Sequence, residues 1–115
     1  MSNDTFNTTI IEEFKFLAQQ AMRDAQYAHD LIFEKNEKAA IAYLNSAISK
    51  FSALKSLYYA RYEQLAHPEF DNMLHCFDSF EREMLNNIRT NHSHQWTDIE
   101  FTKFKDSFES SGISQ

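Results

Sequence analysis

The residues with the clearest chemical potential stand between positions 89 and 94, in the stretch RTNHSH. Arg89 opens this stretch and His94 closes it, with four residues between them. A guanidinium group binds phosphate oxygens in a two-pronged geometry, and an imidazole can accept or release a proton near neutral pH. The pair therefore has the chemistry needed to hold a phosphodiester and to transfer a proton during its cleavage.

The spacing Arg-x4-His resembles the motif of HEPN-domain ribonucleases, a family of helical bundles that are often dimers. The resemblance covers the six residues from Arg89 to His94. It implies that these two side chains would act on the scissile phosphate of RNA at a dimer interface. A HEPN-like ribonuclease is therefore the alternative function that the sequence leaves open.

The other reactive side chains lack the grouping that catalysis or metal binding needs. A metal site requires three or four converging ligands, and neither His92 with His94 nor the adjacent His75 and Cys76 supplies such a set. Cys76 lies between apolar residues with no Lys or Arg within a helical turn, which is typical of a buried thiol. We therefore expect no metal, no cofactor and no catalytic residue apart from the ribonuclease alternative.

Composition restricts the fold that must position these residues. The chain has 115 residues, which predicts one domain, and 43% of them are hydrophobic, including eleven Phe. Gly and Pro occur once each, which is too few for the turns of an all-β protein. The sequence therefore predicts an all-α fold, a single up-and-down four-helix bundle with a short fourth helix.

Charge and hydropathy restrict the partners and the compartment. The formal net charge is −6, which disfavours nucleic acid as a partner because nucleic-acid binders present a basic face. No apolar run reaches the roughly 18 residues of a membrane span, and the start of the chain lacks the pattern of a signal peptide. The single cysteine suits a reducing compartment, so we predict a cytoplasmic protein that does not enter membranes.

Local signals divide the chain into a bundle domain of residues 9–109, flanked by disordered segments at 1–8 and 110–115. The expected helices cover approximately residues 10–35, 37–66, 68–89 and 98–109. The signals at their starts are a capping box Thr9-x-x-Glu12, an N-cap at Asn36, Pro68 as a first helical residue, and a second capping box Thr97-x-x-Glu100.

The second expected helix carries two opposed stripes at about 100° per residue. The large apolar stripe comprises Ala40, Leu44, Ala47, Phe51, Leu54, Tyr58 and Leu65. The small-residue stripe comprises Ala42, Ser46, Ser49, Ala53, Ser56 and Ala60. The first helix offers a set of alanines to match it, Ala18, Ala21, Ala25 and Ala28. The favoured interpretation packs the small-residue stripe against these alanines and makes the second helix central. An oligomer interface and a plain exposed face are the alternatives.

These patterns favour a small acidic protein without enzymatic activity, which acts as a protein–protein interaction or regulatory module. Its partner would be another protein or a second copy of itself, as in a homodimer. The candidate interface residues are Tyr59, Ser49, Ala53, Ser56 and Ala60, because tyrosine is enriched at interfaces and small residues let helices approach closely. A small-ligand pocket lined by Phe and Met is a further possibility that the sequence leaves open.

Overall fold

The computed structural model describes residues 3–90 and 94–112, and the side chains from residue 9 onward within those ranges. All the secondary structure in these residues is helical, which confirms the predicted all-α class. The helices are α1 (Asn3–Phe33), α2 (Glu37–Ala60), α3 (Tyr62–Leu65), α4 (Pro68–Thr90) and α5 (His94–Ser110).

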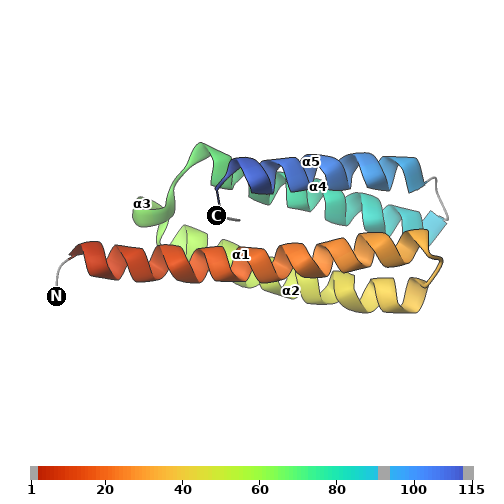
Figure 1. Ribbon diagram of the computed structural model, residues 1–115, viewed down its shortest axis with the longest axis horizontal. Helices are drawn as coiled ribbons and strands as arrows, with labels where there is room; N and C mark the ends of the chain where they lie inside the picture. Colours follow the sequence, from red (N-terminus) through yellow and green to blue (C-terminus); the bar gives the residue numbers. More distant parts are fainter. Residues whose placement is uncertain (1–2, 91–93, 113–115) are drawn as a thin grey trace.

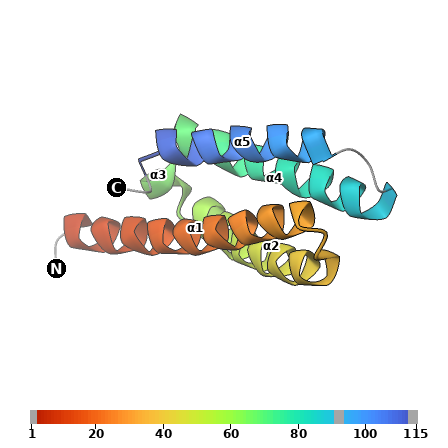
Figure 2. The ribbon, with the colours of Figure 1, turned by 45° about the vertical axis from the view of Figure 1, so that its right-hand side comes forward.

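The four long helices form a bundle of two antiparallel hairpins (Figure 1). One hairpin is α1 with α2 and the other is α4 with α5, and the contact within each hairpin is more extensive than the contact between them. The one-turn helix α3 lies at the crossing from one hairpin to the other. Both views show the N-terminal turns of α1 projecting beyond the end of α5 (Figure 2). The bundle is accordingly elongated, at 53 × 22 × 22 Å.

Both predicted capping boxes are wrong, because their threonines lie inside helices. The helix α1 begins at Asn3, so Thr9 lies two turns inside it rather than at its start. The helix α5 begins at His94, and Thr97 is fully buried in its first turn. Once a helix has nucleated, each further residue adds a hydrogen bond at little cost, so a polar segment can extend a helix past a good capping signal.

The turn between α1 and α2 matches its prediction and adds one feature. The Asn36 Oδ1 atom accepts a hydrogen bond from Ala39 N at 3.4 Å, which confirms Asn36 as the N-cap of α2. Lys35 adopts a left-handed conformation with φ 61°. Its N–H donates to Ile32 O, and the N–H of Asn36 donates to Leu31 O. These two bonds are those of a Schellman motif, which ends a helix through one left-handed residue.

The second helix is shorter than predicted, because the chain leaves helical geometry at Arg61, where φ is −121° and ψ is 37°. The predicted helix to residue 66 is therefore two elements, α2 and α3. The hydroxyl of buried Tyr58 donates to Asp71 Oδ1 at 2.8 Å and accepts from His67 N at 3.3 Å. These bonds hold the end of α2 to the start of α4, so the break has a tertiary cause. The predicted start of α4 at Pro68 is confirmed.

The helix α5 ends in an ordered turn at the only glycine of the chain. Gly112 has φ 77°, and its N–H donates to Glu109 O, while Ser111 N donates to Ser107 O. A left-handed glycine after the last helical turn is a common helix terminator. Residues 110–112 therefore belong to α5 and its cap, and the remaining residues of the predicted C-terminal segment lie outside the described residues.

The core forms where the two hairpins face each other, and it is built largely from phenylalanine. The Phe51 and Phe77 rings stack with their centroids 3.7 Å apart, and Phe104 packs against both rings edge-on. All seven residues of the large apolar stripe are buried, as predicted. Each buried Phe contributes about 1.5–3 kcal/mol relative to an exposed one, so this face decides how α2 is oriented.

The prediction that the small-residue stripe packs against α1 is wrong. Five of its six members are exposed, and the sixth, Ser46, is half-buried. The four alanines of α1 are fully buried, whereas the stripe meets α1 through Ser46, which donates a hydrogen bond to Asp24. In a bundle of two hairpins each helix has a single inward face, and the large side chains of α2 occupy it. The helix α2 is therefore not a central helix buried on both sides.

Candidate functional site

The interface residues predicted from the sequence all lie on the solvent side of α2. Together with neighbouring exposed residues they form what we call the outer face of α2. Its members are Ala42, Asn45, Ser49, Ser52, Ala53, Ser56, Tyr59 and Ala60. Tyr59 is the most exposed large hydrophobic side chain among the described residues, at 67%. Its ring packs edge-on against the ring of buried Tyr58.

No free charge lies on the outer face of α2. Between Ala39 and Ala60 the sequence has two charged residues, Lys50 and Lys55. Lys50 donates to Asp24 on α1 at 2.5 Å, and Lys55 is paired with Asp78 on α4. The lysines thus tie α2 to its neighbours on either side. The surface between them carries small, hydroxyl and aromatic side chains.

Asp24 is the centre of a buried polar cluster between α1 and α2. Its carboxylate accepts hydrogen bonds from Ser46 Oγ at 2.6 Å and from Lys50 Nζ, and the residue is 4% exposed. Burial by itself raises the pKa of Asp24, but the hydrogen bonds from Lys50 and Ser46 and the positive charges of Lys50 and Arg23 outweigh it. The pKa of Asp24 is therefore lowered from its ordinary value of 3.8, and the carboxylate is ionised at neutral pH.

The structure places Arg89 and His94 in different surroundings. Arg89 is exposed in the last turn of α4 and lines a surface hollow with Arg82, Leu85 and Asn86. His94 lines a different pocket at the end of the bundle and is the first residue of α5, a helix that was expected to begin near residue 98. Within one chain the two side chains therefore line separate hollows. His92 lies outside the described residues.

His94 is held by a buried hydrogen-bond network. The Asn87 side chain, from a residue only 2% exposed, donates from Nδ2 to His94 Nδ1 at 2.9 Å and to Thr97 Oγ1 at 2.8 Å. The Phe33 ring packs against the His94 ring with centroids 5.1 Å apart. The histidine ring is thus oriented by contacts from α1 and α4, and Thr97 of α5 in turn fixes Asn87.

A second histidine joins α1 to α5 nearby. The His29 ring stacks on Phe101 with centroids 4.3 Å apart, and its two nitrogens lie 2.9 Å from Asp30 Oδ1 and 3.0 Å from Asp98 Oδ1. These contacts connect the ring to a neighbouring aspartate on α1 and to an aspartate on α5. Within the described ranges no three or more His, Cys, Asp or Glu residues are grouped so as to hold a metal ion.

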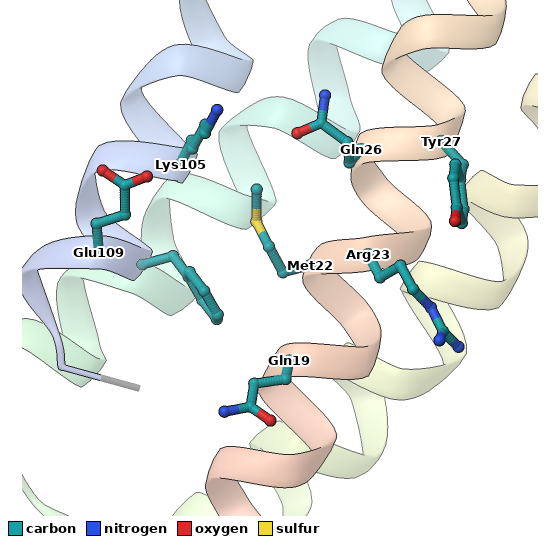
Figure 3. A pocket seen from close by; sticks show the side chains of 8 residues that line it. Gln19, Met22, Arg23, Gln26, Tyr27, Lys105 and Glu109 are labelled. Carbon is teal, nitrogen blue, oxygen red and sulfur yellow. The ribbon is translucent and has the colours of Figure 1, made fainter. Parts of the chain in front are cut away.

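A groove of about 470 Å³ separates α1 from α5 along the side of the bundle. Met22 and Phe108 form its apolar floor, and both are more than nine-tenths buried. Figure 3 shows Met22 and Gln26 reaching from α1 towards α5, with Lys105 and Glu109 on the opposite wall. The sequence left open a small-ligand pocket lined by Phe and Met. This groove contains one residue of each type, but it is open to solvent at the surface rather than enclosed in the core.

Comparison with known proteins supplies no further guide, since no family model, curated protein or solved structure matches the chain. None of the helices within the described residues is long and apolar enough to cross a membrane.

Several residues of these sites, among them Asp24 and Asn87, were not singled out from the sequence, and the conformation of Lys35 in the α1–α2 turn was not predicted. Asp24 had a signal, since it is a charged residue within the alanine-rich segment of α1. Asn87 had none, because asparagine near the end of a polar helix is ordinary and its burial depends on α5. Lys35 had none either, because lysine seldom takes a left-handed conformation and the closing of the turn imposes it.

Proposed function

We propose that the protein is a non-enzymatic protein–protein interaction module that binds through the outer face of α2. The observation that supports this is the absence of free charge on that face in a chain whose net charge is −6. Interface centres are depleted in charged residues and enriched in tyrosine. A helix face of this composition loses little hydration when another helix covers it.

The side chains also suit close packing. Ser49, Ala53 and Ser56 lie along the middle of the face and are exposed. Small residues at three- and four-residue spacing let a second helix approach its partner closely, at or below the usual 8–10 Å. Tyr59 would supply the anchor, because tyrosine combines a large apolar surface with low conformational entropy. The partner is a helical protein surface, with a second copy of this chain the first to test.

Site-specific photo-crosslinking in cells tests the proposal directly. A photoreactive amino acid at Ser56 is expected to trap a partner, whereas the same residue at exposed Thr102 on α5 is expected to trap none. The mass of the adduct identifies self-association, which adds a second chain of 13.6 kDa. Adducts at neither position, or equal adducts at both, would refute the outer face of α2 as the interface.

A charge substitution tests the same surface with purified protein. Ala53→Arg keeps a good helix former and places a charge at the centre of the face, so it should abolish the adduct formed from Ser56. Thr102→Arg adds the same charge on α5 and serves as the control. Light scattering at two protein concentrations would show whether the wild-type chain self-associates. It would also show whether Ala53→Arg, but not Thr102→Arg, converts the protein to a monomer.

The HEPN-like alternative gains no support that would make it a second proposal. Arg89 and His94 line separate cavities within one chain, and neither belongs to the outer face of α2.

A further inference from the structure

A pocket of about 420 Å³ opens at the end of the bundle where α1 turns into α2 and α4 is followed by α5. Figure 1 shows the ends of these four helices gathered there. Its lining residues are Ile32, Lys35, Glu37, Asn87, Ile88 and His94. None of them belongs to the outer face of α2, so this pocket is independent of the proposed interaction surface.

His94 presents a defined hydrogen-bond donor in this pocket. The amide nitrogen of Asn87 can only donate, so His94 Nδ1 must accept, and the neutral ring then carries its proton on Nε2. Asn87 is itself fixed by its second bond, to buried Thr97. Within the described residues, Nε2 of His94 has no hydrogen-bond partner of its own. A buried network therefore orients a ring whose remaining N–H is available to a ligand.

Lys35 and Glu37 add one charge of each sign. Lys35 lies in the α1–α2 turn and Glu37 is the first residue of α2; both are exposed, and neither forms an ion pair within the described part of the chain. The apolar part of the lining is Ile32, which is buried, and Ile88, which is half-buried. Glu37 would repel an anion and Lys35 would repel a cation, whereas a ligand with both charges would satisfy both side chains.

We propose that this pocket binds a free aliphatic α-amino acid. Its carboxylate accepts hydrogen bonds from Lys35 Nζ and His94 Nε2, and its ammonium group donates to Glu37. Its side chain covers Ile32 and Ile88. The pocket volume lies in the range of about 300–1,000 Å³ that is usual for small-molecule sites.

Titration of the full-length protein with leucine, followed by the backbone amide NMR signals, tests the ligand class. Leucine is expected to shift the signals of residues 35–37, 87–88 and 94. N-acetylleucine lacks the ammonium group and leucinamide lacks the carboxylate, so each should bind about tenfold more weakly, as expected for one lost charge-assisted hydrogen bond. No response to leucine, or equal affinity for leucine and both blocked forms, would overturn the proposal.

Two variants assign the charges. Glu37→Gln is expected to weaken leucine binding about tenfold and to leave the binding of N-acetylleucine unchanged, because only leucine has an ammonium group. Lys35→Gly should weaken the binding of both leucine and N-acetylleucine, since both have a carboxylate. Glu34→Gln alters an exposed residue of the same turn that does not line the pocket, and it should change neither affinity. Unaltered leucine affinity in Glu37→Gln would contradict the assigned orientation.

Discussion

The two lysines of α2 form a matched pair that tests how burial sets the strength of an ion pair. Lys50 pairs with Asp24 and Lys55 with Asp78, each across to a neighbouring helix. The lysine side chains are similarly exposed, at 31% and 34%. Their partners differ, because the side chain of Asp24 is 6% exposed and that of Asp78 is 41% exposed.

Replacing each lysine by methionine should therefore have unequal effects on the free energy of unfolding. Removing one partner of a fully buried pair costs about 3–5 kcal/mol, because an uncompensated charge stays buried. Lys50 is partly exposed and Ser46 still donates to Asp24, so we expect a loss of about 2–3 kcal/mol in Lys50→Met. Lys55→Met breaks a pair near the surface and should cost less than about 1 kcal/mol.

The difference should also depend on pH, with a sign that follows from Asp24. The pKa of this carboxyl is lowered in the folded protein, so its stabilising contribution is present above 3.8 and is lost as the pH falls through the folded value. A protonated Asp24 no longer needs a cation. The excess loss in Lys50→Met should therefore be full at neutral pH and should shrink below pH 3.8.

Urea unfolding followed by circular dichroism measures all three proteins, at neutral pH and at acidic pH values where the wild type stays folded. Equal losses in Lys50→Met and Lys55→Met would refute the inference that the burial of Asp24 controls the cost. An excess loss in Lys50→Met that is the same at every pH would refute the assignment of that cost to the ionised carboxylate.

Three further predictions concern single residues. Lys35→Gly should raise the free energy of unfolding by about 0.5–1 kcal/mol, because glycine adopts a positive φ without strain. A thermal melting temperature that does not rise would count against it. Tyr58→Phe should lower stability by about 1 kcal/mol through the lost hydrogen bond to Asp71. Burial and that hydrogen bond raise the pKa of Tyr58 from 10.0 to about 12, so the wild type should lose this advantage as the pH rises from 10 towards 12. Denaturant unfolding across this pH range measures the difference in free energy of unfolding between the two proteins. A difference that does not shrink as the pH rises would contradict the prediction. Thr97→Val keeps the side-chain shape but removes the acceptor for buried Asn87, and should cost about 1–2 kcal/mol in urea unfolding. An unchanged midpoint would show that this bond contributes nothing.

The candidate sites were predictable only in part. Helical periodicity places Ser49 and Ala53 opposite the large apolar stripe, but it does not decide whether that side of the helix meets α1 or solvent. The grouping of His94 with Asn87 and Lys35 does not follow from any spacing. These residues come from three separate segments, and only the packing of α5 against α4 and α1 brings them together.

The sequence by itself determined the all-α class, the large apolar stripe of α2, the N-cap at Asn36 and the start of α4 at Pro68. Each of these depends on interactions within a few residues, namely side-chain periodicity, a capping hydrogen bond and the missing N–H of proline. Tertiary structure alone decided that the small-residue stripe faces solvent and that the second helix is interrupted at Arg61. Both outcomes depend on contacts between helices, since one bundle core admits one face of each helix and Tyr58 ties the end of α2 to α4.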